Sequence, residues 1–327
     1  VKKGPAKIAR VHFFILDPCV TTFCSAIEKS ARFYCGCFAC STGNMASSAP
    51  PTAGHYNDYE ELETSRNTVF IIDPQNDFHP GGTLAIPTAH ADAARITTLI
   101  NSHGAEIDDM VVSLDTHQKL HIAHSLFWVN ASGEHPPPWT PIPIEAVESG
   151  VWKTTNPKWQ SWGLDYVHAL AANGRFSLLI WPEHCLIGTK GHAVVDDISA
   201  ALSAWCELKV RCVEYALKGH NMLTENYSAL RADVVRPDDP RTHFNGTLFA
   251  RLRKANRVLV CGQALSHCVA FTCRDLVDRW PKEDVAKLVL LTDCSSPVPE
   301  FEQAAEEFIA EMAAAGVTIT TSDKLDW

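Results

Sequence analysis

The chain has 327 residues, 46% of them hydrophobic, and a formal net charge of −10. That is enough apolar material for one large globular domain or two small ones. The acidic balance argues against a nucleic-acid partner. No apolar run approaches the roughly 20 residues that cross a bilayer, so we expect no membrane partner either.

The first 66 residues differ in composition from the rest. They hold five of the twelve cysteines and run into a stretch rich in Ser, Pro and Ala. Cys35, Cys37 and Cys40 form a C-x-C-x-x-C cluster, but a fourth metal ligand at matching spacing is missing. We expect residues 1–66 to be a disordered or targeting extension, and residues 67–327 to form one domain.

The other seven cysteines lie after residue 180, mostly inside apolar segments. Buried thiols of this kind are typical of a reducing compartment. We therefore expect an intracellular protein, in the cytoplasm or, if residues 1–66 are a targeting segment, in an organelle.

From Thr68 onward, short β-branched runs alternate with longer amphipathic stretches. This alternation predicts an α/β fold, doubly wound, with a mostly parallel sheet and helices on both faces. The predicted strands are 69–73, 109–115, 176–182, 209–215, 257–262, 287–293 and 317–321, and the predicted helices are 91–104, 194–205, 246–255, 268–280 and 299–316. Residues 130–173 show no clear period and predict a long excursion that edges the active site.

Ligands bind at the carboxyl ends of the strands in such sheets. Asp73 ends the first predicted strand, where a buried charge is costly unless it is paired. Asp77 lies in the turn that follows, and there simple turn formation is an equally good interpretation.

The second predicted strand ends at Asp115, and the third is followed by His184. Three histidines, His117, His121 and His124, come shortly after Asp115. One carboxylate with several imidazoles at neighbouring strand ends predicts a divalent metal site.

Lys218 follows the fourth predicted strand and precedes Gly219, which suggests tight local backbone. Cys268 begins the helix after the strand at 257–262. A helix N-terminus and a nearby Lys218 ammonium would lower the pKa of this thiol, while Asp73 could accept its proton. Free backbone N–H groups near Ala264 and Cys268 could hold an oxyanion.

Five motifs occur in a fixed order along residues 68–321: IIDPQNDF followed by Pro-Gly-Gly, LDTH, WPEHCLIGT, LKG and GQALSHCV. In these motifs the chain resembles the isochorismatase-like cysteine hydrolases, and nicotinamidases in particular. The resemblance implies a catalytic triad of Asp73, Lys218 and Cys268. It also implies an oxyanion hole from the amides of Ala264 and Cys268, with a cis peptide bond between Gln263 and Ala264.

The resemblance further implies a bound divalent metal, often zinc, and an aromatic sandwich around the substrate ring. Asp115, His117 and His184 match the metal ligands, with His121 or His124 as a further ligand. Phe78 and Trp181 match the aromatic positions.

The sequence thus predicts an amidohydrolase that cleaves a small amide through a thioester, most simply nicotinamide to nicotinate and ammonia. Two alternatives stay open: another amidase of this superfamily acting on a carbamoyl or ureido compound, and a non-catalytic binding or scaffold protein. Isochorismate hydrolysis is disfavoured because the nucleophilic cysteine is retained. The expected partner is a small amide, and family resemblance suggests a homo-oligomer.

Overall fold

The computed structural model describes residues 65–327. The cysteine cluster and nearly all of the predicted N-terminal extension lie outside these residues, so their role stays a prediction. Within the described part of the chain, no helix is both long enough and apolar enough to cross a membrane.

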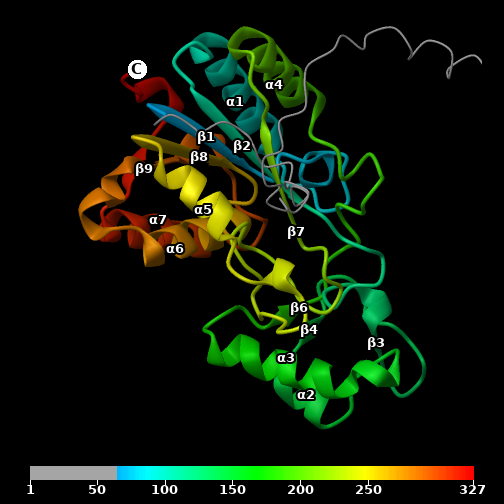
Figure 1. The fold of residues 1–327 in the computed structure, drawn as a ribbon. Coiled ribbons are helices and arrows are strands. Elements are labelled where there is room, and N and C mark those ends of the chain that lie inside the picture. Colours follow the sequence, from blue (N-terminus) through cyan, green and yellow to red (C-terminus); the bar gives the residue numbers. More distant parts are fainter. Residues whose placement is uncertain (1–64) are drawn as a thin grey trace, which may run out of the picture. The chain divides into compact units, whose positions relative to one another are not determined.

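A six-stranded sheet forms the centre of the domain, in the order β10-β9-β8-β1-β2-β7 (Figure 1). All of its strand pairs are parallel. The strands are β1 (Asn67–Ile72), β2 (Asp109–Asp115), β7 (Glu214–Lys218), β8 (Arg257–Gly262), β9 (Leu288–Leu291) and β10 (Thr318–Thr320). The predicted fold class is confirmed.

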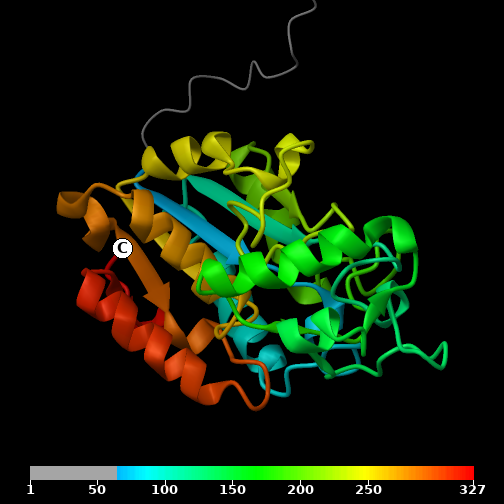
Figure 2. The same cartoon turned by 90° about the horizontal axis from the view of Figure 1, so that it is seen from below.

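Helices cover both faces of this sheet, as Figures 1 and 2 show. On β1, Val69 and Ile71 pack in one buried cluster, whereas Phe70 and Ile72 pack in another, because successive strand side chains point to opposite faces. The first cluster includes residues of α1 (Ala89–His103) and α4 (Asp196–Lys209). The second includes residues of α5 (Gly246–Arg253), α6 (Cys268–Arg279) and α7 (Glu302–Ala315).

An insert between β2 and α4 forms its own small layer, gathered at one end of the sheet in Figure 1. It holds β3 (Trp128–Val129), β4 (Pro141–Ile142), α2 (Ile144–Glu148), β5 (Lys153–Thr154), α3 (Gln160–Ala172) and β6 (Leu178–Leu179). Residues 130–173 are therefore more regular than the sequence suggested. Tyr166, Val167 and Leu170 bury one side of α3 in a shared cluster with Leu178 and Ile180.

The prediction that residues 176–182 form a strand of the central sheet was wrong. Only Leu178–Leu179 is a strand, and it pairs antiparallel with β4 outside that sheet. The Ile180 N–H donates to Thr140 O at 2.9 Å, so the apolar run is buried by the insert. His184 follows this run in a loop and does not lie at a strand end of the central sheet.

The predicted strand at 209–215 was misplaced. Helix α4 continues to Lys209 and ends at Val210, whose φ of 50° stops the helix. Strand β7 starts at Glu214 and includes Lys218 as its last residue. It is an edge strand, so Tyr215 and Leu217 remain 47% and 49% exposed.

Candidate active site

Asp73 directly follows β1 and turns the chain with a φ of 45°. Its side chain is fully buried, and its Oδ1 accepts a hydrogen bond from the Ser113 hydroxyl at 2.6 Å. The Asp73 N–H donates to Ser113 O at 3.1 Å. Neighbouring strands β1 and β2 thus fix a carboxylate at the carboxyl edge of the sheet.

Lys218 reaches this carboxylate from the end of β7. Its Nζ lies 2.9 Å from Asp73 Oδ2, 3.1 Å from Asp115 Oδ1 and 2.8 Å from Asn226 O. Burial alone would lower the pKa of Lys218, but the carboxylates of Asp115 and Asp73 raise it well above its usual value. Lys218 is therefore a buried, charged ammonium with three oxygen partners.

Cys268 is the first residue of α6, and its Sγ lies 3.5 Å from Lys218 Nζ. Burial raises the pKa of the Cys268 thiol well above its usual value, although Lys218 opposes this shift. The prediction of a lowered pKa was wrong because desolvation of the thiolate outweighs the ammonium and the helix N-terminus. Burial also raises the pKa of Asp73, against Lys218. A neutral thiol beside a more basic carboxylate is an arrangement for proton transfer.

Two backbone donors are free next to this thiol. Among the bonds formed within residues 65–327, neither the Ala264 N–H nor the Cys268 N–H has an acceptor. The peptide bond between Gln263 and Ala264 is cis, as predicted. The two N–H groups suit the expected oxyanion hole.

The turn after β1 supports this site structurally. Asp77 accepts the Cys185 N–H at 2.7 Å and the Thr83 N–H at 3.2 Å, which favours its interpretation as a turn residue. Gln75 exchanges two hydrogen bonds of 2.7 Å with the backbone of Asp115. Both contacts fix the loops that carry the titratable groups.

Four buried histidines and a buried glutamate cluster beside the triad residues. Two sets of three have ligand atoms within 4.8 Å of one another: His117, His124 and His184, and His117, His121 and Glu225. Asp115 borders the cluster, with its Oδ2 3.5 Å from His117 Nδ1 and 3.3 Å from His184 Nε2. The structure thus brings all the predicted metal-site residues together.

The cluster is chemically suited to a divalent cation. Both ring nitrogens of His124, Nδ1 of His117 and Oε2 of Glu225 are buried without a hydrogen-bond partner in the described part of the chain. Burial lowers the pKa of His121 to about 4 and of His124 to about 2, so these imidazoles are neutral, the form that binds metals. Despite burial, Asp115 and Glu225 raise the pKa of His117 to about 9, which shows that the surroundings favour positive charge.

A pocket lies over the thiol and beside the cluster. Phe78 and Trp181, both buried, line it together with Leu84, Asp115, His184, Glu225, Tyr227, Ala264, His267, Cys268 and Val298. Trp181 Nε1 donates to the Tyr227 hydroxyl at 3.0 Å. The pocket therefore joins an aromatic wall to the nucleophile.

Sequence reasoning missed Glu225, Tyr227 and His267. His267 directly precedes Cys268, and Glu225 and Tyr227 follow Lys218 within the segment TENYS. Their only signal in the sequence was their proximity to Lys218 or Cys268. The Glu225 N–H donates to the Tyr166 hydroxyl at 3.1 Å, so helix α3 of the insert holds this segment in place.

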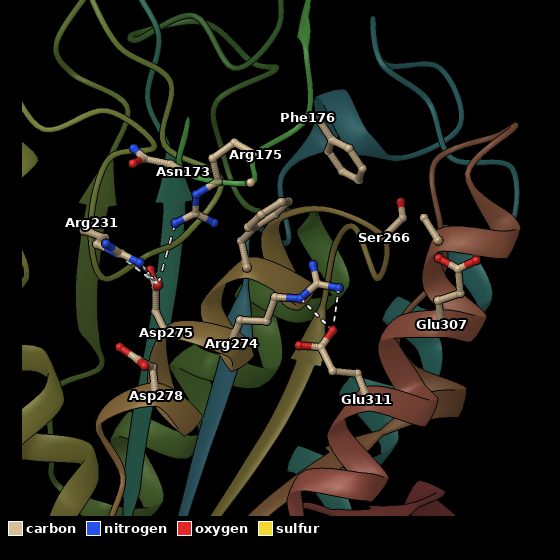
Figure 3. Close-up of a pocket in the computed structure, with 13 residues that line it drawn as sticks. Asn173, Arg175, Phe176, Arg231, Ser266, Arg274, Asp275, Asp278, Glu307 and Glu311 are labelled. Atoms are coloured by element: carbon tan, nitrogen blue, oxygen red, sulfur yellow. Dashed lines mark hydrogen bonds and ion pairs between the residues drawn. The ribbon is translucent and has the colours of Figure 1, made fainter. Parts of the chain in front are cut away.

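A larger cavity of about 520 Å³ lies elsewhere, between residues 173–176, α6 and α7 (Figure 3). Its charges largely pair with one another: Arg231 with Asp275 at 2.8 Å, and Arg274 with Glu311 at 2.7 Å. None of the triad residues lines it. The chemistry is therefore assigned to the smaller pocket at Cys268.

The chain is similar to nicotinamidases in sequence and in fold. No family model matches the chain. The chain is 24% identical to the nicotinamidase of Escherichia coli (strain K12) over 259 residues, which cover 79% of this chain and 95% of that protein. The solved structure of the nicotinamidase pyrazinamidase of Acinetobacter baumanii has a TM-score of 0.55 at 22% identity, and the match covers 80% of this chain and 99% of that one. The solved structure of the yeast nicotinamidase bound to the inhibitor nicotinaldehyde has a TM-score of 0.55 at 19% identity. The match covers 78% of this chain and 99% of that one.

The parallel sheet and its covering helices define the isochorismatase-like α/β hydrolase fold. Over most of its length the chain is similar to nicotinamidases, at 24% and 25% identity.

Proposed function

We propose that this protein hydrolyses nicotinamide to nicotinate and ammonia. The observation that carries the proposal is the convergence of Asp73 after β1, Lys218 at the end of β7 and Cys268 at the start of α6. Cys268 lines the pocket, and the other two side chains lie behind it. The names of the similar proteins support the choice of substrate. Phe78 and Trp181 offer aromatic surface for a flat ring.

The first half of the reaction forms a thioester. Asp73 takes the proton of the Cys268 thiol as the sulfur attacks the amide carbon, and the carbonyl oxygen becomes an oxyanion. The N–H groups of Ala264 and Cys268 stabilise that oxyanion. One such donor typically lowers the activation barrier by about 3 kcal/mol. The tetrahedral species then collapses, the carbon–nitrogen bond breaks, and Asp73 returns its proton to the leaving nitrogen, which departs as ammonia.

The second half releases the acid. Water attacks the thioester carbon while Asp73 accepts one of its protons. The carbon–sulfur bond then breaks, the carboxylic acid is released, and Asp73 returns the proton to the Cys268 sulfur, which becomes the thiol again. Lys218 stays charged throughout and stabilises Asp73 as the ionised base between transfers.

His117, His124 and His184, or His117, His121 and Glu225, would hold a divalent metal, for which we propose zinc. Such an ion supplies a Lewis acid that orients a substrate acceptor. The protein's own contribution is to keep the imidazoles of His121 and His124 neutral and to place the carboxylates of Asp115 and Glu225 beside His117.

The proposal is tested by assaying ammonia release from nicotinamide. We expect turnover by the wild type, and none by Cys268→Ala with an unchanged circular dichroism spectrum. Cys273→Ala is the matched control, because Cys273 is a buried thiol of the same helix that lies outside the pocket; this variant should keep its activity. Substantial residual turnover by Cys268→Ala, or no ammonia from the wild type, would contradict the proposal.

A further inference from the structure

Gln263 and Asp92 form a buried polar pair that the mechanism above does not use. Gln263 directly precedes Ala264 and is only 1% exposed. Its Nε2 donates to Asp92 Oδ2 at 2.9 Å, and Asp92 is itself only 3% exposed. Within residues 65–327 this is the only side-chain hydrogen bond of Gln263, because its Oε1 is buried without a partner. The contact joins the first turn of α1, which holds Asp92, to the segment between β8 and α6.

The peptide group between Gln263 and Ala264 carries one of the two expected oxyanion donors. Neither its C=O nor its N–H forms a hydrogen bond with another group in the described part of the chain. Its neighbours in the chain are held instead: the Gln263 N–H donates to Ile72 O at 2.7 Å, and Ala264 O accepts the N–H groups of His267 at 3.0 Å and Val269 at 3.1 Å. The direction of the Ala264 N–H therefore depends on how firmly its flanks are fixed.

The Asp92 contact fixes one of these flanks from the side. A peptide group is planar, so it turns as a unit about the axis that joins its two Cα atoms. The Gln263 side chain, held by Asp92, restrains the Gln263 Cα at one end of that axis. Asp92 is a firm point of attachment, because Ala93 and Ile96 of the same helix pack in the buried cluster on the sheet.

We propose that Asp92 and Gln263 are positioning residues for the oxyanion hole. The Asp92 carboxylate holds the Gln263 side chain, which keeps the Ala264 N–H directed at the point where negative charge develops. Neither residue lines the pocket at Cys268, so neither touches the substrate. The inference rests on the proposed amide hydrolysis. Because full charge on the oxygen exists only near the transition state, loss of the contact should change kcat and not KM.

The first test removes the contact from each side. Gln263→Leu loses the donor, and Asp92→Ala loses the acceptor. We expect each to lower kcat for nicotinamide by about tenfold or more, with KM within about twofold of the wild type. The double variant should be no slower than the slower single variant, because both changes break one contact. Asp92→Asn keeps an oxygen acceptor for Gln263 and should recover most of the lost kcat.

Arg95→Met is the matched control. Arg95 Nη1 lies 3.5 Å from Asp92 Oδ1, and the Arg95 side chain is 47% exposed. This variant removes a different contact of the same carboxylate and leaves the bond to Gln263 in place, so kcat should not change. If Arg95→Met lowered kcat as much as Asp92→Ala does, a general disturbance of α1 would explain the result and the inference would be overturned.

A second test uses nicotinaldehyde, which forms a stable analogue of the tetrahedral species. Its carbonyl carbon bonds to the Cys268 sulfur, the thiol proton passes to Asp73, and the carbonyl oxygen becomes an oxyanion without loss of any group. The inhibition constant should rise about tenfold in Gln263→Leu and in Asp92→Ala. The dissociation constant of nicotinamide, measured by calorimetry in proteins that also carry Cys268→Ala, should stay the same.

The two constants distinguish positioning of the oxyanion donor from general damage to the fold, which would weaken both ligands together. An equal loss of affinity for both ligands, or an unchanged inhibition constant, would overturn the inference. Unchanged kcat in Gln263→Leu and Asp92→Ala would do so as well, while leaving the amidase function intact. If the wild type releases no ammonia from nicotinamide, the proposed function fails and this inference with it.

Discussion

The ammonium nitrogen of Lys218 lies 2.9 Å from Asp73 Oδ2 in a site where the Asp73 side chain has no exposed surface. Replacing Lys218 with Met would leave the Asp73 carboxylate buried without a cation and would remove one of the cations beside Asp115. Removing one partner of a buried ion pair typically costs about 3 to 5 kcal/mol. We expect Lys218→Met to lower the free energy of unfolding by that amount, measured by urea denaturation, and to abolish ammonia release.

Lys209→Met provides the contrast for this prediction. Lys209 pairs with Asp108 at 3.2 Å, but both side chains are partly exposed, at 19% and 23%. Such pairs contribute about 0 to 1 kcal/mol. Equal losses of stability in the two variants would show that burial of the Lys218 pair has no special effect.

Glu225 offers a test of the metal cluster. Its Oε1 lies 3.1 Å from His117 Nε2, and its Oε2 is buried without a hydrogen-bond partner in the described part of the chain. We expect the purified protein to bind zinc, and Glu225→Gln to lower the affinity by about tenfold or more. Calorimetric titration of the metal-free protein measures this.

The surface pair of Glu148 and His168, also 3.1 Å apart, supplies the control. Both side chains are about half exposed, so Glu148→Gln should leave zinc affinity unchanged. If the wild type binds no zinc, the proposal of a metal at this site is wrong.

The sequence predicted the central sheet well because its strands are short apolar runs bounded by amphipathic helices. It failed at 176–182, since periodicity identifies a buried apolar run without identifying its strand partner. Leu178 and Ile180 are buried like the side chains of a central strand, but they pack against α3 and β4 of the insert. It also failed at 209–215, because the exposed Tyr215 and Leu217 of an edge strand do not give the pattern of a buried one.

Within the site, the residues at predicted strand ends, in the five motifs or in the histidine run after Asp115 were predictable, whereas Glu225 and Tyr227 were not. Asp73 and Lys218 adjoin the carboxyl ends of parallel strands, a position that the topology alone makes functional. Glu225 and Tyr227 lie on a loop whose path depends on contacts with α3. The sequence also gave the wrong direction for the Cys268 pKa, because the extent of burial is a property of the packed structure.

Gly219 tests the tight backbone next to Lys218. It has a φ of 81°, and a Cβ there would lie 3.0 Å from Asp115 Oδ1 and 3.4 Å from His117 Nε2. Gly219→Ala should therefore weaken both zinc binding and amide turnover, in addition to a backbone strain of roughly 1 to 2 kcal/mol. Gly174→Ala is the matched control, since Gly174 has a φ of 63° with no atom within 4 Å of a built Cβ. If Gly174→Ala lowered turnover as much, strain alone would explain the effect.

Asp233 predicts a pH dependence of stability. It is buried beside Arg175, whose Nε lies 3.3 Å from its Oδ1, and close enough to Glu225 and Asp275 for both carboxylates to raise its pKa. Burial is the largest cause, and the pKa of Asp233 reaches about 7 in the folded chain against an ordinary 3.8.

Between those two values the unfolded chain has lost the Asp233 proton while the folded chain keeps it. The contribution of Asp233 to the free energy of unfolding therefore falls as the pH rises from about 4 to about 7, by about 1.4 kcal/mol for each pH unit. Asp233→Asn cannot ionise, so the free energy of unfolding of the wild type, relative to this variant, should decrease between about pH 5 and about pH 7 in urea titrations. A difference that stays constant over this range would mean that Arg175 keeps Asp233 ionised.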